Sequence, residues 1–361
     1  MIPKVGSINA KKLIAYCGGV EDVFKQSKKA LLKIPGVGEC LATEIVNQNI
    51  LSKAEQEVEF IEKYNIKALF YLDADYPERL RQCDDGPIVL FVKGKNAINF
   101  NREKYISIVG TRKATDYGKK ICEDIITGLS QKGYSPIIVS GLAYGIDIVA
   151  HKSALKNDLQ TLAVLGHGLD TIYPVSHRNT AKDIVETGAL LTDFPSKTKF
   201  DRNNFIKRNR IIAGLSDATI VVESALEGGA LITADLANSY NREVFAVPGN
   251  VGAKYSMGCN QLIKSNKAAL IETFEDIEYL LGWEPVNIQK PPKQITLFSE
   301  FSEDELKIVD YLKGVDQESI DIICIKLQMP VSKVSSLLLN LEFAGVVKNK
   351  PGKVFALNTS K

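Results

Sequence analysis

The sequence has few of the residues that build metal sites and disulfide frameworks. It contains three histidines, and its six cysteines are scattered without a C-x-x-C pair. This spacing fits neither a zinc site nor a disulfide framework, so we expect no metal and reduced cysteines, most of them in the core. No apolar run approaches the roughly 18 residues that a membrane span needs, and residues 1–19 lack the apolar core of a signal peptide. We therefore expect a cytoplasmic protein without a membrane partner.

Two common nucleotide-binding signatures are also missing. The sequence has no G-x-x-x-x-G-K-[ST] motif, which disfavours a P-loop ATPase. Residues 166–171 begin like a dinucleotide fingerprint but lack its third glycine, and the second predicted core strand ends in Ser140 rather than in an acid that could hold a ribose. A nicotinamide or flavin enzyme is therefore disfavoured, and no cofactor is expected.

Charge is balanced along most of the chain, whose formal net charge is +2, but residues 196–210 are an exception. This stretch, SKTKFDRNNFIKRNR, holds six basic residues and one acid and runs into IIAGLS, which predicts a helix. Asn203 or Asn204 can cap that helix. Its first two turns then carry three cations, Lys207, Arg208 and Arg210.

Cations at a helix N-terminus oppose the helix dipole by up to about 1 kcal/mol each when they are exposed. An anion bound between them would remove this penalty. A solvated basic face is the alternative, but the clustering and the neighbouring Phe200 and Phe205 favour a phosphate-binding site.

Residues 105–283 alternate short, β-rich apolar runs with amphipathic helical stretches. Nearly continuous apolar strands separated by helices predict an α/β fold with a Rossmann-like, doubly wound parallel sheet. Ligands bind such sheets at the carboxyl ends of the strands. The expected strands are residues 105–110, 136–141, 161–166, 189–194, 218–224 and 243–249.

The remaining residues predict smaller units around this core. Residues 1–66 read as a helical, helix-hairpin-helix or SAM-like domain with two similar turns, at 2–6 and 34–38, for which we favour a structural or accessory role. Residues 67–104 form a connecting extension, and residues 284–297 a proline-bearing linker.

Residues 298–361 predict a winged-helix domain, with helices at 303–312, 318–327 and 331–343 followed by strands at 346–349 and 354–357. The candidate recognition helix carries Lys333 as its only cation. A major-groove reader should present more arginine or lysine, so we favour a packing or protein-contact module over a sequence-specific DNA reader.

The loops after the first two core strands carry phosphate-binding features. In the first loop, Gly110 permits close backbone approach, Thr111 offers a hydroxyl, and Arg112 supplies a fork that matches phosphate oxygens. The second loop, residues 140–147, opens another helix and can add N–H donors. Both loops are therefore candidates for one anion site.

Two of the residues near these loops could be mistaken for a catalytic pair. Asp147 and His151 lie four apart on a predicted helix, but we favour an interpretation in which Asp147 bonds loop N–H groups and His151 packs at the helix end. No serine or cysteine nucleophile has an evident activating context. Asp193, at a strand end, can orient a basic side chain or a loop N–H.

The motifs GTRKATDYG, SGLAYGID, FIKRNRIIAGLS and GGALITADLA, together with the GHG...YP loop and FAVPGN...GCNQLI, occur in an order and spacing that resemble the DprA/Smf family. The resemblance extends to the N-terminal helical domain, to residues 76–94 and to the tail. It implies a non-enzymatic protein that binds single-stranded DNA, forms a homodimer and loads a RecA-type recombinase during natural transformation.

The resemblance also implies a DNA-binding site. Its members are Gly110, Thr111 and Arg112 in one loop, Ser140, Gly141 and Gly145 in the next, and Phe205, Lys207, Arg208, Asn209 and Arg210 in a basic wall beside them. The chain departs from the family pattern at Tyr144, where an arginine is common, and at residues 227–233, where a serine-glycine pair is usual. Tyr144 could instead stack on a base.

Two other functions compete with this one. A nucleotide phosphoribohydrolase-like enzyme uses a related sheet, but residues 227–235 lack the proline, the third glycine and the closing glutamate of its P-G-G-x-G-T-x-x-E motif. A transcriptional regulator that uses the tail would require a preference for duplex DNA of one sequence.

Overall fold

The computed structural model describes residues 2, 5–47, 50–96, 98–101, 104–283, 301–315, 317–350 and 354–358. The chain divides into two compact units, Met1–Asn287 and Ile288–Lys361. Each unit is described by itself.

A nine-stranded sheet forms the centre of the larger unit, in the order β1-β2-β6-β5-β4-β3-β7-β8-β9. Seven neighbouring strands, from β6 to β9, run parallel, and the β1–β2 hairpin adds to β6 in the antiparallel direction. The predicted doubly wound parallel sheet is therefore confirmed, and the extension at 67–104 supplies its antiparallel edge. The strands are β1 (Lys67–Phe70), β2 (Val89–Lys93), β3 (Tyr105–Val109), β4 (Ile137–Ser140), β5 (Thr161–Val164), β6 (Ala189–Thr192), β7 (Ala218–Val221), β8 (Glu243–Ala246) and β9 (Ala269–Leu270).

Helices cover both faces of this sheet because its central strands are apolar on both sides. Alternate residues of β3 belong to opposite cores: Tyr105 packs on one face, and Ile106 and Ile108 pack on the other. The first face is covered by α10 (Arg202–Leu215), α11 (Gly229–Ser239) and α12 (Met257–Lys264). The second is covered by α7 (Asp116–Gln131), α8 (Ile146–Lys156), α9 (Arg178–Thr187) and α13 (Phe274–Leu280).

The winding direction of the sheet reverses between β3 and β7. From β3 the chain moves outward through β4, β5 and β6, and it then returns to place β7 on the other side of β3. The loops that follow these parallel strands meet at one edge of the sheet, where open α/β sheets bind ligands.

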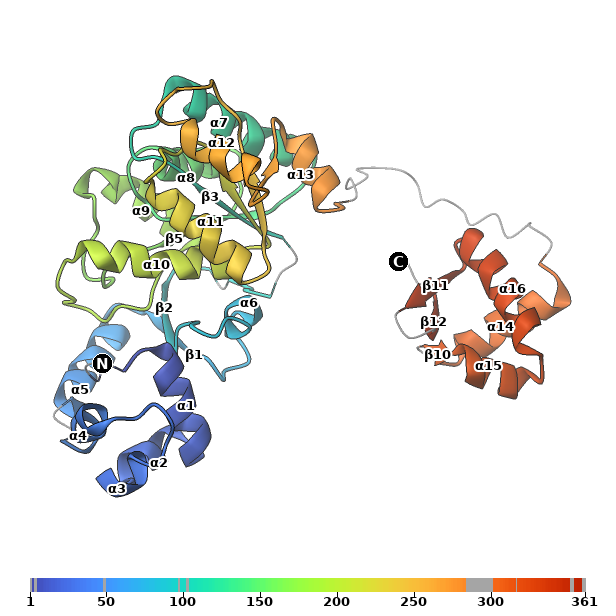
Figure 1. Ribbon diagram of the computed structural model, residues 1–361, viewed down its shortest axis with the longest axis horizontal. Helices are drawn as coiled ribbons and strands as arrows, with labels where there is room; N and C mark the ends of the chain where they lie inside the picture. The colour runs from blue at the N-terminus through green and yellow to red at the C-terminus, as the bar shows by residue number, and fades with distance from the viewer. Residues whose placement is uncertain are drawn as a thin grey trace. The chain divides into compact units, whose positions relative to one another are not determined.

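The N-terminal helices gather at one end of the larger unit, beside β1 and β2 (Figure 1). They are α1 (Ser7–Cys17), α2 (Val20–Lys25), α3 (Lys28–Leu31), α4 (Glu39–Asn47) and α5 (Leu51–Lys63), and the short helices α6 (Glu78–Arg81) and η1 (Val175–His177) follow later in the chain. The turn at 34–38 joins α3 to α4 as expected, and Gly36 has a φ of +87°, which favours glycine. The first copy of this turn contains Pro3 and Lys4, which lie outside the described residues. Lys11 of α1 donates to the carbonyls of Cys83 and Asp84 and so ties the helices to the core.

The smaller unit has three helices and a β-hairpin, as expected for a winged helix. Its elements are α14 (Glu303–Lys313), β10 (Glu318–Ser319), α15 (Ile320–Leu327), α16 (Val331–Phe343), β11 (Val347–Lys350) and β12 (Val354–Leu357). The second helix begins two residues later than expected because Glu318 and Ser319 pair with β12. The predicted linker at 284–297 and the hairpin turn at 351–352 lie outside the described residues.

Among the described helices, no single one is long and apolar enough to cross a membrane. The pair α15 and α16, bent by 113°, passes that test by length and composition alone. Apolar residues of both helices, including Ile323 and Leu338, are buried in the core of the smaller unit.

Candidate functional site

The loop after β3 is fixed from both sides and presents Arg112 at the surface. The Thr111 amide donates to the Glu223 carbonyl at 2.7 Å, and the Thr111 carbonyl accepts from the Ile146 amide at 3.2 Å. Arg112 is exposed, and its guanidinium carbon lies 5.8 Å from the centroid of the Phe205 ring. The loop therefore places a cation next to an aromatic ring.

Glu223, which follows β7, is a positioning residue that sequence analysis missed. Its buried carboxylate accepts from the Thr115 amide at 2.9 Å and from the Thr115 hydroxyl at 2.5 Å. Thr115 in turn caps α7 by accepting from the Gly118 amide. In the sequence, this role is indicated by the position of Glu223, an acid at the end of an otherwise apolar strand.

The loop after β4 needs its two glycines. A Cβ on Gly141 would overlap the Arg208 guanidinium, and one on Gly145 would overlap the Thr111 carbonyl oxygen. Gly145 also has a φ of +79°. Ser140 is buried and donates to the Ile108 carbonyl at 2.6 Å, so it holds the strands together rather than facing solvent.

Aromatic side chains surround the start of α10. Phe205 packs over Gly166 and lies 5.2 Å from Phe200 and 5.8 Å from Tyr173, measured between ring centroids, and Tyr173 and Phe200 are 4.5 Å apart. Phe200 and Tyr173 are 56% and 43% exposed. Together with Arg112, these three rings form what we call the strand-end surface, which offers a cation and exposed ring faces.

The helix itself begins differently from the prediction. Asp201, not Asn203 or Asn204, is the N-cap of α10, and its carboxylate accepts from the Asn203 amide at 2.8 Å. An aspartate accepts this bond through a charged oxygen and also complements the helix dipole. Asp201 therefore supplies, from within the chain, the negative charge that a bound anion was expected to supply at this end of the helix.

The expectation that Arg208 forms part of an exposed basic wall is wrong. Arg208 is 4% exposed, and its Nη1 donates to the Gly141 carbonyl at 2.7 Å and to the Val164 carbonyl. Burial lowers the pKa of Arg208 to about 10, so it remains a cation at neutral pH. It supports the second loop from beneath.

The other polar residues of this helix point elsewhere. Arg210 forms a partly buried ion pair with Asp193 and donates to the Asp85 carbonyl, which confirms the expectation that Asp193 can orient a basic side chain. Lys207 is exposed and lines a groove with Arg210. Asn209 Nδ2 donates to the Gly229 carbonyl at 3.4 Å. The structure therefore joins Phe205 and Arg208 to the two loops but separates Lys207, Asn209 and Arg210 from them.

Asp147 and His151 both have structural partners. Asp147 accepts from the Gly141 amide at 3.2 Å, as expected. His151 lies in the middle of α8 rather than at its end, and its Nδ1 is 2.7 Å from the Thr161 hydroxyl. Burial lowers the pKa of His151 to about 3, so the ring is neutral. Within the described part of the chain, no group of three His, Cys, Asp or Glu residues could hold a metal ion.

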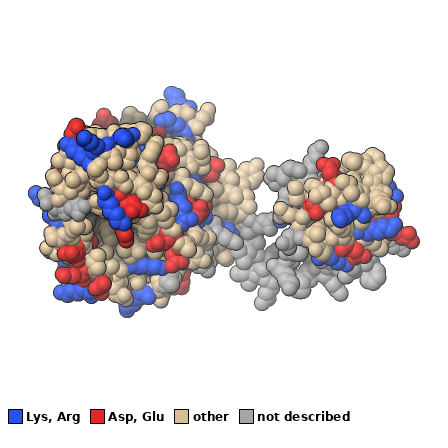
Figure 2. All heavy atoms as spheres, turned by 90° about the horizontal axis from the view of Figure 1, so that it is seen from below, with Lys and Arg blue, Asp and Glu red and all other residues tan. Residues whose placement is uncertain are grey.

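Charge alone does not mark a binding face. On the side drawn in Figure 2, basic and acidic side chains are interspersed over the larger unit. The strand-end surface is distinguished instead by its combination of loops, rings and one exposed arginine.

Comparison with protein families identifies the chain. A model of the DNA recombination-mediator protein A family matches residues 67–282, and a DprA winged helix domain matches residues 290–353. The chain belongs to this family. The predicted resemblance to DprA/Smf proteins and the predicted winged-helix tail are therefore confirmed.

Individual relatives cover most of the chain. Protein Smf of Synechocystis sp. is 34% identical over an alignment that spans 96% of this chain and 94% of that protein. The crystal structure of DNA processing protein A from Streptococcus pneumoniae has a TM-score of 0.65 and 31% identity and covers 74% of this chain and 91% of its own. A structure of DNA processing protein A from Helicobacter pylori is described for its single-stranded DNA binding mode. It has a TM-score of 0.54 and 27% identity, and the match covers 60% of this chain and 96% of that chain.

Proposed function

We propose that the chain binds single-stranded DNA at the strand-end surface. The observation that carries this proposal is the exposed Arg112 guanidinium beside Phe205, with Tyr173 and Phe200 next to it. A cation that holds phosphate and ring faces on which bases stack are the two parts of a single-strand binding site. Neither part reads base edges, so binding should be largely indifferent to sequence.

The candidate residues divide into contacts and supports. Arg112 and Phe205 contact the strand, and the Thr111 hydroxyl, which accepts from the Lys113 amide, keeps its own proton to donate. Gly110, Gly141 and Gly145 let the loops pack closely, while Ser140 and Arg208 hold them from below. Lys207, Asn209 and Arg210 lie away from this surface and do not share these phosphate contacts.

We further propose that the protein is a non-enzymatic mediator that acts as a homodimer and hands DNA to a RecA-type recombinase. Membership of the recombination-mediator family supports this role. A physical reason supports dimerisation, because one such surface covers few nucleotides and two linked surfaces gain avidity through effective concentration.

The binding site is tested with Arg112→Gln, assayed by fluorescence anisotropy on labelled oligonucleotides. Removing one charge-assisted hydrogen bond, about 1.5–3 kcal/mol, should weaken binding about 10- to 150-fold. The logarithmic salt slope should fall by roughly 0.7 for each phosphate that the variant no longer neutralises. Lys132→Gln, at the exposed C-terminal end of α7, makes the same charge change on the opposite edge of the sheet and should leave both values unchanged. A folded Arg112→Gln protein with unaltered affinity and slope would contradict the site.

The mediator role needs a separate assay. Light scattering should detect a dimer at working concentrations, and strand exchange on DNA precoated with single-strand-binding protein should accelerate when the protein is added to its cognate recombinase. Full activity from a monomer would remove dimerisation from the mechanism. DNA binding without any acceleration would refute the mediator role and leave the DNA site intact.

A further inference from the structure

A groove lies on the other side of α10 from the strand-end surface. At 100° per residue, Lys207 and Arg210 face roughly opposite to Phe205 and Arg208. They line a groove of about 1020 Å³ that runs between α1 and the β1–β2 edge of the sheet. Small-molecule sites in proteins are mostly apolar clefts of roughly 300–1,000 Å³ with a few placed polar groups. This groove has the size and composition of such a site.

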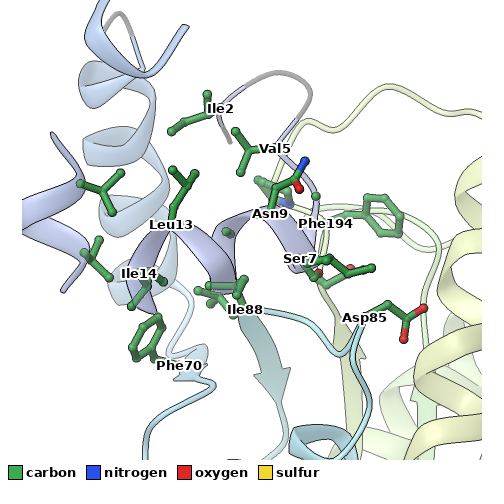
Figure 3. Close-up of a pocket in the computed structure, with 18 of the residues that line it drawn as sticks. Ile2, Val5, Ser7, Asn9, Leu13, Ile14, Phe70, Asp85, Ile88 and Phe194 are labelled. Carbon is green, nitrogen blue, oxygen red and sulfur yellow. The ribbon is translucent and has the colours of Figure 1, made fainter. Parts of the chain in front are cut away.

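The two ends of the groove differ in chemistry. Figure 3 shows Ile14 beside Phe70 at one end and Ser7 near Asp85 and Phe194 at the other. Aliphatic and aromatic side chains form the first end. Polar groups, including those of Lys207 and Arg210 on α10, line the groove as well. A ligand that fills the groove therefore needs an apolar body and a polar head.

One buried atom of the groove lacks a hydrogen bond. Oδ2 of Asp193 pairs with Arg210, but its Oδ1 is buried and has no partner among the described residues. A buried acceptor left unsatisfied costs about 1–3 kcal/mol, so a donor from a ligand would stabilise the site. Burial raises the pKa of the Asp193 carboxyl, although Arg210 opposes this.

Two further features favour an anionic group at the polar end. The N-cap of α1 is Gly6, which has no side chain to cap the helix, and no acid lies in its first turn. Within the described part of the chain, no side chain caps its first N–H groups, which can therefore donate to an anion. Lys207 is exposed and has no ion pair within the described part of the chain, so it can supply a positive charge to a ligand in the groove.

We propose that this groove binds a nucleotide, with the base between the apolar walls, a base N–H directed to Asp193, and the phosphate at Lys207 and the first turn of α1. A nucleotide joins in one molecule the planar apolar body, the N–H donor and the anion that the groove accommodates. The nucleotide could be free or could be one unit of a bound strand. Only the second source rests on the proposed single-strand binding.

Calorimetry with thymidine 5′-monophosphate tests the free nucleotide. Lys207→Gln should weaken its binding about tenfold. Ile8→Trp, at an exposed position of the groove wall, should abolish binding by filling the space. Lys132→Gln, with the same charge change far from the groove, should bind the nucleotide as the unmodified protein does.

Photo-crosslinking tests the strand as the source. An oligonucleotide that carries 5-iododeoxyuridine should give adducts at Phe194 or Phe70 if one of its units enters the groove, in addition to adducts on the strand-end surface. Calorimetric binding without groove adducts assigns the site to a free nucleotide, and groove adducts without calorimetric binding assign it to the strand. Either result supports the proposal.

The proposal is overturned if thymidine 5′-monophosphate does not bind and no adduct forms in the groove. It is also overturned if the nucleotide binds equally well to Lys207→Gln and Ile8→Trp. Because strand affinity is measured separately through Arg112, failure of the single-strand function and failure of the groove give different results.

Discussion

Replacing Arg208 by methionine should destabilise the larger unit rather than merely weaken DNA binding. Methionine fills a similar volume but has no donor, so the Gly141 and Val164 carbonyls would lose the bonds that Arg208 makes in a buried position. Each buried group left unsatisfied costs about 1–3 kcal/mol. The expected decrease in the free energy of unfolding is therefore about 2–6 kcal/mol.

This decrease is large enough to measure as a change in melting temperature. For domains of roughly 150–250 residues, 1 kcal/mol corresponds to about 2–4 °C, so Arg208→Met should melt about 4–24 °C lower. Arg208→Lys keeps a charge and donors but lacks the planar guanidinium group. Its melting temperature should therefore lie between those of the unmodified protein and Arg208→Met. The matched control is Arg112→Met, because an exposed substitution of this kind usually changes stability by less than about 0.5 kcal/mol.

Calorimetry or circular dichroism measures the melting temperatures of Arg208→Met, Arg112→Met and the unmodified protein. Desolvation of a buried charge can outweigh its hydrogen bonds, and apolar replacement of a buried ion sometimes stabilises a protein. An unchanged or higher melting temperature for Arg208→Met would show that desolvation dominates here.

Two further predictions concern pH and the tail. The pKa of His151 is about 3 in the folded chain and about 6.5 in the unfolded chain, so between these values only the unfolded state takes up its proton. The free energy of unfolding should therefore fall by up to about 1.4 kcal/mol per pH unit below pH 6.5, and urea unfolding at pH 7 and 5 should show a smaller fall for His151→Gln than for the unmodified protein. Removing residues 298–361, which belong to a separate compact unit, should leave most single-strand affinity in anisotropy assays, and a folded truncation that no longer binds would contradict this.

The sheet could be predicted because its signal is local. The strands of residues 105–249 read as apolar runs, and each is buried on both faces in the structure, apart from the first residue of β8. The approach of the loop at Arg112 to the loop at Gly141 was predictable for the same reason, because parallel strand ends share an edge. The role of Asp193 also followed from its position at a strand end.

The orientation of α10 could not be predicted in this way. Adjacent residues on a helix point about 100° apart, so Lys207 and Arg208 are alike in sequence but face different surroundings. Which of them is buried depends on how the helix is rotated over the sheet, and that is set by packing of Ile211 and Leu215 in the core. A run of cations therefore indicated a charged segment but not which cation reaches solvent.

This rotation gives α10 two chemically different faces and places two of its positive charges below the protein surface. Arg208 and Arg210 carry positive charge into the interior, and each is stabilised there by a fixed set of acceptors: carbonyls for Arg208, and Asp193 with a carbonyl for Arg210. Through these bonds, the two side chains hold loops and neighbouring segments together. Arg112 and Lys207 have no such acceptor among the described residues and lie on opposite sides of the helix. If anions bind this unit, these two exposed cations are where they should be sought, one on each face.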